Sequence, residues 1–273
     1  MLISFSQPDF SQPDIALLWI IRLAAVGILI DALEWLTIWR ELRADGAFGW
    51  PWLRSRRVFL QHAPFAFFFD FPGVIGLLLL RGSGALWLLA EPAVGRNVAL
   101  TLLFFTGLSL HLRNFPYGID GHHRMMLVIV GALWLQQLAP TSPLVQQATL
   151  WFIALQSVLS YVTAGWGKVS APSWRSGDGL LQALNTPSVG ATPVVAHFLA
   201  QYRWVATTCN WGVMLIECLF PLVLFSPPPL AFLWLGWGLL FHGMNAVMLG
   251  FNKFFWAWTA TYPAILYIVY HYG

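Results

Sequence analysis

Long apolar stretches, separated by short polar segments, recur along almost the whole chain. About 20 consecutive apolar residues are needed for a helix to cross the hydrocarbon core of a bilayer. Eight stretches approach that length, and they predict an all-α polytopic membrane helix bundle of about eight transmembrane helices. The expected spans cover residues 15–37, 72–93, 97–112, 124–141, 146–166, 204–225, 229–249 and 254–271.

The polar segments between these spans set the predicted orientation and organisation. Eight crossings place both termini on one side of the membrane. The opposite side then receives the loops 38–71, 113–123, 167–203 and 250–253. Because these loops hold most of the Lys and Arg residues, the positive-inside rule makes their side cytoplasmic. No internal repeat or low-complexity linker is visible, so we expect one integral-membrane domain over residues 1–273, with an interfacial helical segment near 173–203.

Composition supports a membrane protein and argues against a nucleic-acid partner. The chain is 58% hydrophobic and only 9% charged, with a mean hydropathy of +0.68. A soluble domain carries about 25% charged residues because its surface faces water, so lipid must solvate much of this chain. The net charge is only +3, and no basic stripe with interleaved aromatic residues is present. We therefore expect membrane lipids and membrane-protein subunits as partners.

Two acidic residues lie inside the first expected span, where an unpaired charge is costly. Asp31 and Glu34 are spaced i, i+3 and therefore share one helix face. Partners on neighbouring helices would satisfy them if they only hold helices together. A functional site is the alternative.

A polar cluster marks the entry to the expected span 124–141. Asp120 is a candidate N-cap, which places His122, His123 and Arg124 in the first helical turn. A helix N-terminus attracts anions, so two imidazoles and a guanidinium at this position predict an anion site. A cluster hydrogen-bonded to lipid head groups explains the same residues.

Lys168 and His242 are the two remaining polar groups that point to chemistry. Lys168 ends the fifth span, where partial burial would favour the neutral amine that a general base requires. A lysine that only extends its ammonium group to the interface is the alternative. His242 and Asn245 are spaced i, i+3 in the seventh span and aim toward the Lys168 side, although a lone buried histidine is usually structural. Glu217 lies mid-span, one turn before Pro221, where a kink is expected.

Spacing along the chain predicts neither a metal site nor a disulfide. Cys209 and Cys218 fall nine residues apart in one expected helix. That spacing separates them by roughly 13 Å, which is too far for a disulfide. No His and Cys spacing typical of metal ligands occurs.

Several short motifs occur in an order that resembles a known membrane family. They are Arg22 and Asp31 in the first span, Gly95-Arg96 before the third, the histidines entering the fourth, Ala-Gly-x-x-Lys at 164–168, Trp-x-x-Gly at 174–177 and Phe-His-x-Met-Asn at 241–245. From about residue 14 to residue 271 the chain resembles the transmembrane part of vitamin K-dependent γ-glutamyl carboxylases. It looks most similar to their bacterial relatives, the horizontally transferred transmembrane (HTTM) proteins.

The resemblance implies a quinone or hydroquinone cofactor and a location in the bacterial inner (cytoplasmic) membrane. In that family a lysine deprotonates the hydroquinone, and oxygenation of the anion gives a strong base. This base removes a γ-proton from peptidyl glutamate, and CO2 traps the resulting carbanion. Lys168 matches this lysine. The implied catalytic residues are Lys168, His123 and His242, and the implied cofactor-binding residues are His122, Arg124, Trp174 and Asn245. The carboxylases work on the luminal side, whereas the charge count places the Lys168 side in the cytoplasm, so the orientation stays open.

Different classes of function fit these observations. The first is a quinol-linked or lipid-modifying enzyme that uses Lys168 as its base. The second is a non-catalytic accessory or structural subunit of a larger membrane complex, for which 16 Trp and 21 Phe offer broad lipid-facing and partner-facing surfaces. A DoxX-like quinone-interacting protein is a third, because Gly-x-x-Lys helix ends recur there. Transport is less favoured, since no inverted repeat is visible.

Overall fold

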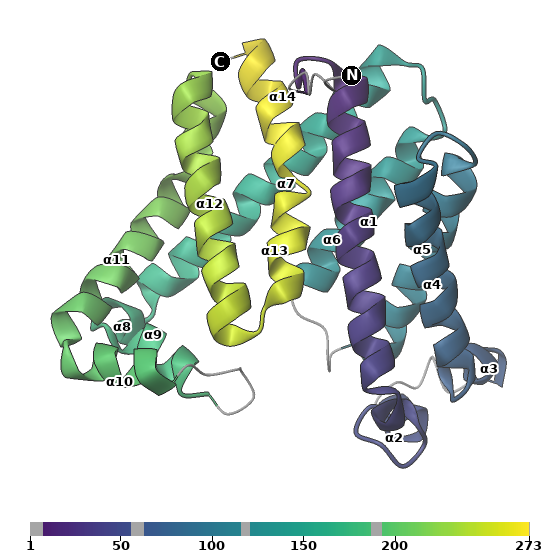
Figure 1. Ribbon diagram of the computed structural model, residues 1–273, viewed down its shortest axis with the longest axis horizontal. Coiled ribbons are helices and arrows are strands. Elements are labelled where there is room, and N and C mark those ends of the chain that lie inside the picture. The colour runs from purple at the N-terminus through teal and green to yellow at the C-terminus, as the bar shows by residue number, and fades with distance from the viewer. Residues whose placement is uncertain (1–7, 56–62, 116–120, 187–192, 273) are drawn as a thin grey trace, which may run out of the picture. The chain divides into compact units, whose positions relative to one another are not determined.

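The computed structural model describes residues 8–55, 63–115, 121–186 and 193–272 (Figure 1). Of the described residues, 83% are helical and none lies in a strand, which confirms the all-α class. The chain forms two compact units. Unit 1 comprises Met1–Ala16 and Leu150–Gly273, and unit 2 comprises Leu17–Thr149. The expectation of a single domain stays a prediction, and each unit is described by itself.

Five helices of the described chain are long and apolar enough to cross a membrane, which supports an integral-membrane protein. They are α1 (Pro13–Thr37), α4 (Gly73–Ala90), α7 (Pro143–Ser170), α11 with the 3-10 helix η3 (together Arg203–Phe225) and α12 (Pro228–Leu249). Each coincides with one of the expected spans.

The other three expected spans are helical, but they do not meet the same criteria. The helix α5 (Arg96–Asn114) carries two arginines, a histidine and two asparagines. The helix α6 (Gly121–Gln136) has only 16 residues, fewer than a crossing normally needs. The last expected span divides into α13 (Asn252–Thr259) and α14 (Tyr262–Tyr272), with Pro263 at the start of the second helix. The expected eight crossings are therefore not confirmed.

Buried arginines bind backbone carbonyls inside unit 2, where α4 packs on α5 and α5 packs on α6. Arg81 donates a 2.8 Å hydrogen bond to the Leu103 carbonyl, and a Cβ at Gly107 would lie only 2.6 Å from its guanidinium. Arg113 donates to the carbonyls of Phe69, which ends α3 (Ala63–Phe69), and of Phe48. The short helices η1 (Trp39–Leu42) and α2 (Trp50–Arg54) complete this unit.

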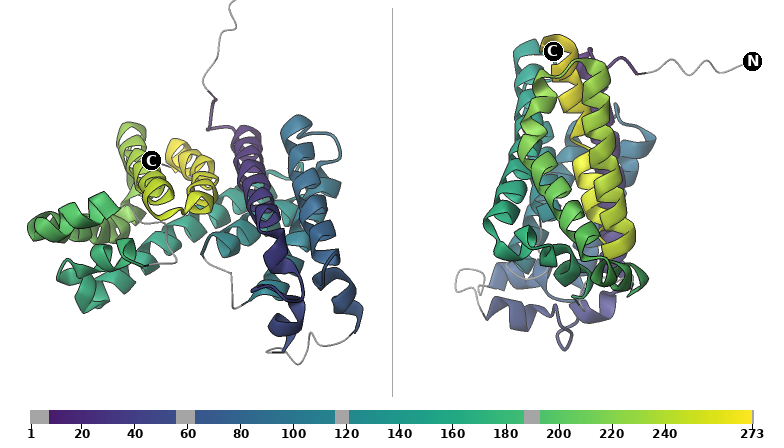
Figure 2. Two further views of the ribbon diagram at one scale, coloured as in Figure 1. Left: turned by 60° about the horizontal axis from the view of Figure 1, so that its bottom comes forward. Right: turned by 90° about the vertical axis from the view of Figure 1, so that its left-hand side faces the viewer.

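Unit 1 is built from the long helices α7, α11 and α12 and the broken pair α13–α14. The helices α12 and α13 run side by side in opposite directions, joined by a turn at Gly250 (Figures 1 and 2). Three short helices pack near the start of α11: α8 (Pro172–Arg175), α9 (Asp178–Leu184) and α10 (Pro193–Gln201). They form the helical segment expected near 173–203. At Phe220, next to Pro221, α11 gives way to η3 (Phe220–Phe225), as the proline predicted.

Candidate functional site

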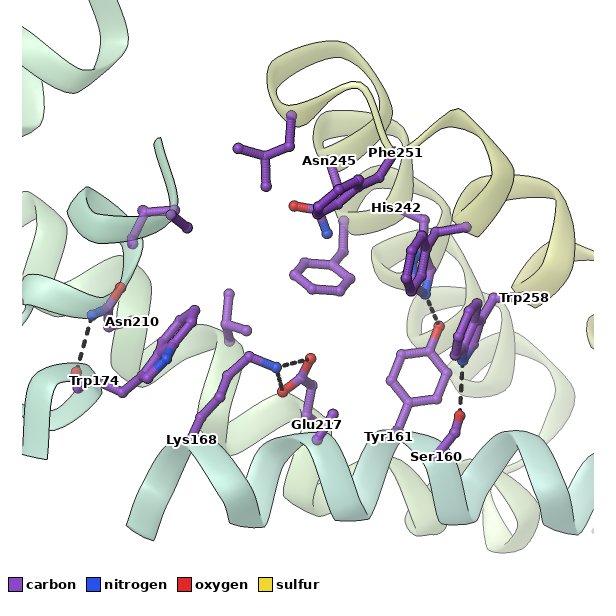
Figure 3. Close-up of a pocket in the computed structure, with 17 residues that line it drawn as sticks. Ser160, Tyr161, Lys168, Trp174, Asn210, Glu217, His242, Asn245, Phe251 and Trp258 are labelled. Atoms are coloured by element: carbon purple, nitrogen blue, oxygen red, sulfur yellow. Dashed lines mark hydrogen bonds and ion pairs between the residues drawn. The ribbon is translucent and has the colours of Figure 1, made fainter. Parts of the chain in front are cut away.

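A pocket of about 280 Å³ lies inside unit 1 (Figure 3). Its walls come from α7, α8, α9, α11, α12 and α13, and most of the lining is apolar. Phe241, Phe251, Phe254 and Trp258 supply aromatic surface. A concave apolar site with a few polar groups is typical of small-molecule binding.

An ion pair lines one side of this pocket. Lys168 lies in the last turn of α7, and its Nζ donates to both carboxylate oxygens of Glu217 on α11, at 2.8 and 2.6 Å (Figure 3). The Lys168 Nζ also lies 5.3 Å from the centroid of the Trp174 ring, within cation–π range. The side chain of Glu217 is 3% exposed and that of Lys168 is 19% exposed. The carboxylate and the indole face therefore hold the end of the Lys168 side chain in place.

A close approach of two helices positions this pair. Gly165 precedes Lys168 on α7, and a Cβ there would lie 2.9 Å from the Cys218 backbone nitrogen and from the Glu217 Cβ. These distances are shorter than any ordinary contact, so only glycine allows α11 to pack this tightly against α7. The absent side chain brings Glu217 within reach of Lys168.

A second hydrogen-bonded group joins the pocket to the interior of unit 1. The Tyr161 hydroxyl lies 2.9 Å from His242 Nε2 and 2.9 Å from the Tyr262 hydroxyl. The His242 ring stacks on Trp258, with ring centroids 5.2 Å apart, and Trp258 Nε1 donates to the Ser160 hydroxyl (Figure 3). These contacts fix the position of the His242 ring.

Two buried polar atoms of the lining residues have no hydrogen-bond partner among the described residues. They are His242 Nδ1 and Asn210 Oδ1, in side chains that are 5% and 0% exposed. The Asn210 amide nitrogen donates to the Trp174 carbonyl at 3.0 Å, so this amide orientation leaves its oxygen as an acceptor (Figure 3). A buried polar atom without a partner costs about 1–3 kcal/mol. Both atoms are therefore suited to bind a ligand in the pocket.

The structure brings together four of the residues that the sequence singled out. Lys168, Trp174, His242 and Asn245 all line the pocket, and His242 faces the Lys168 side as expected. Glu217, noticed only as a charge beside a proline, proves to be the partner of Lys168. Its signal was a carboxylate inside an apolar span.

The sequence pattern did not single out two other pocket residues, Tyr161 and Asn210. An amide inside an apolar span was a signal for Asn210, but the roles of both residues depend on contacts with helices that are distant in the sequence. Spacing along one helix cannot reveal such contacts.

The entry histidines and Arg124 belong to unit 2. His122 and His123 lie in the first turn of α6, as predicted, while Asp120 lies outside the described residues. Arg124 is exposed and lies over the Phe115 ring, 5.9 Å from its centroid. Both histidines face Asp31 of α1, at 3.7 and 3.5 Å from its Oδ1, so a neighbouring helix approaches this buried carboxylate.

Comparisons with known proteins do not identify a family or a function for this chain. No family model matches the chain, and neither a curated protein nor a solved structure matches it. The functional assignment therefore rests on the pocket itself.

Proposed function

We propose that this chain is a membrane enzyme of the HTTM and carboxylase type, which binds a quinol-like lipid in the pocket of unit 1 and uses Lys168 as a base. One observation carries the proposal: a buried Lys–Glu ion pair and two buried polar atoms without partners line one largely apolar pocket. Charged groups in an apolar cleft are candidates for a catalytic site.

The polar atoms favour the reduced, hydroxyl-bearing form of such a ligand. Asn210 Oδ1 can only accept a hydrogen bond, so it requires a donor such as a quinol hydroxyl. His242 Nδ1 donates or accepts according to the tautomer that Tyr161 selects. A volume of about 280 Å³ suits one ring, with an isoprenoid tail leaving through the open side.

In this proposal the ion pair accepts one proton from the ligand hydroxyl in two steps. A proton first moves from Lys168 Nζ to the Glu217 carboxylate across 2.6 Å, which leaves a neutral amine and a carboxylic acid. Low-dielectric surroundings penalise both charges of such a pair, which favours this transfer. The amine then accepts the proton of the ligand hydroxyl, and the resulting anion lies beside the regenerated ammonium group.

Mass spectrometry of the lipids that accompany the purified protein tests the proposal. Ala164 and Thr163 are adjacent and both exposed on α7, but only Ala164 lines the pocket. In mild detergent we expect wild type and Thr163→Phe to retain a quinol or isoprenoid, and Ala164→Phe to lose it because the new ring fills the cavity. Retention in Ala164→Phe would place the lipid elsewhere. A stoichiometric protein partner and no lipid in wild type would instead favour the accessory-subunit alternative.

The same proposal includes the eight crossings that the apolar stretches predict, in the bacterial inner membrane that the family resemblance implies. In it, α5, α6 and the α13–α14 pair join the five helices that are long and apolar enough to cross. Packing against other helices rather than composition would satisfy their polar residues.

A further inference from the structure

A second cluster of chemically active side chains lies in unit 2, away from the residues of the pocket. It comprises Asp31 of α1 with His122 and His123 of α6. The Asp31 and His122 side chains are 8% and 5% exposed, while that of His123 is 17% exposed. The proposed chemistry of Lys168 uses none of these three residues.

The distances within this cluster are close to those between ligands of a single metal ion. His122 Nε2 lies 3.7 Å and His123 Nε2 lies 3.5 Å from the same oxygen, Asp31 Oδ1. Ligands bound tetrahedrally at about 2.0–2.1 Å lie about 3.3–3.4 Å from one another. All three ligand atoms lie within 4.8 Å of one another, close enough for the group to be a candidate metal site.

The charges around the cluster are consistent with such an ion. The two imidazole rings lie side by side, with their centroids 3.8 Å apart. Metal ligation uses neutral imidazoles. Arg81 of α4 is a further charged group that acts on Asp31. Because Arg81 already offsets the Asp31 charge, a bound cation would favour an anionic exogenous ligand.

We propose that Asp31, His122 and His123 bind one divalent transition-metal ion of the Zn²⁺ or Fe²⁺ class. Two imidazoles and a carboxylate are typical of catalytic zinc sites and of non-haem ferrous sites, and three protein ligands leave a position for water or another small ligand. The partly exposed ring of His123 offers a path for the ion. The sequence missed this site because its ligands come from two helices that are far apart along the chain.

Metal analysis of the untagged, detergent-solubilised protein tests the proposal. We expect about one equivalent of Zn²⁺ or Fe²⁺ per chain by inductively coupled plasma mass spectrometry, and elemental identity distinguishes the two. Anaerobic titration with Co²⁺ should give ligand-field absorption bands that saturate at one equivalent. Asp31→Ala and His123→Gln should each weaken Co²⁺ binding by at least ~10–100-fold, the loss caused by removing even an outer-shell partner.

A matched variant separates this site from incidental binding to surface imidazoles. His197 is exposed on α10, so His197→Gln should bind Co²⁺ as wild type does. Monodisperse wild-type protein that takes up none of Co²⁺, Zn²⁺ and Fe²⁺ would overturn the proposal without reference to any variant. Equal weakening by His197→Gln would also overturn it. Metal content is measured independently of bound lipid. Neither result therefore bears on the proposed function of the pocket in unit 1, which the lipid analysis tests separately.

Discussion

Lys168 and Glu217 act as one unit, because removing either charge leaves the other without its partner in a largely buried position. Removing one member of a buried ion pair costs about 3–5 kcal/mol, since the other charge stays buried without a partner. Glu217 is the more buried residue, with a side chain 3% exposed against 19% for Lys168. We therefore expect Lys168→Met to lower thermal stability in detergent more than Glu217→Gln does, and the double variant to recover most of the loss.

The ion pair also affects how activity is tested. A Lys168→Ala variant is difficult to interpret by itself, because it removes the proposed base and also leaves the Glu217 carboxylate unpaired. The double variant Lys168→Met/Glu217→Gln is the matched control for this effect. It lacks the base, but it replaces both charges and so leaves no unpaired carboxylate. Additive single-variant losses in a double-mutant cycle would contradict the pairing, since an interacting pair couples by about 0.5–3 kcal/mol.

At the scale of single residues, the sequence identifies polar groups by what they cost in an apolar span, but it does not identify their partners. Lys168, His242 and Asn245 were found because a charge, an imidazole and an amide are rare in such a setting. Asn210 became notable only when its buried oxygen proved to have no partner in the described part of the chain. Partnership depends on which helix faces meet, and this depends on packing between elements.

At the scale of elements, Gly165 decides how closely α7 and α11 approach. A Cβ at Gly165 would meet the Cys218 backbone nitrogen at 2.9 Å, whereas a Cβ at Gly167 would meet no atom within 4 Å. Gly165→Ala should cost about 1–3 kcal/mol as an overpacked contact. Gly167→Ala should be neutral or stabilising by up to ~1 kcal/mol because alanine favours the helix.

Thermal unfolding in one detergent compares the two glycine variants directly. Lipid retention provides a second readout, because Gly165→Ala displaces Glu217 and should weaken ligand binding, while Gly167→Ala should not. Equal stability of the two variants would mean that α7 and α11 are not packed in this way.

The start of α9 is tied to the start of α11 by an exposed ion pair that gives a pH dependence. Asp178 accepts hydrogen bonds from the Ser176 hydroxyl at 2.7 Å and from Arg203 at 2.6 Å. The Ser176 hydroxyl, followed by Arg203, lowers the pKa of Asp178 below its ordinary value of 3.8. A depressed carboxyl pKa stabilises the fold above that ordinary value, and the contribution disappears as the pH falls through the lower, folded-state value.

A single substitution isolates this contribution. The difference in melting temperature between wild type and Asp178→Asn should be small at pH 7, because the pair is exposed, and should shrink further at pH 3 and in high salt. A difference that grows toward pH 3 would have the wrong sign for this interaction.

The helices were more predictable than their number of crossings. Every expected span coincides with helix, because hydrophobic length is a strong local signal. The helix α6 nevertheless ends at Gln136, before the apolar stretch does, where the Gln136 and Gln146 amides both donate to the Pro140 carbonyl. Turns made by such side-chain contacts shorten a helix without changing its average hydropathy.

At the scale of the whole molecule, composition predicted a membrane protein and the apolar stretches predicted an all-helical one, whereas the number of crossings needs a parity argument. Five crossings place the termini on opposite sides of the membrane, and eight place them on the same side. Asp9, just ahead of α1, interacts electrostatically with His271 in the last turn of α14, so both ends lie together within unit 1. This proximity favours an even number of crossings.

Reporter fusions at the two termini therefore decide between the schemes. A pair of reporters, one active only in the cytoplasm and one active only outside it, should give the same side for both termini. A reporter inserted between Ala139 and Ser142 is the control, because both schemes place that loop on the N-terminal side. If the loop agrees with the N-terminus and the C-terminus does not, α5, α6 and the α13–α14 pair do not together add three crossings. Lys168 faces the side opposite the N-terminus in either scheme, so the same fusions determine which compartment supplies or receives the proton.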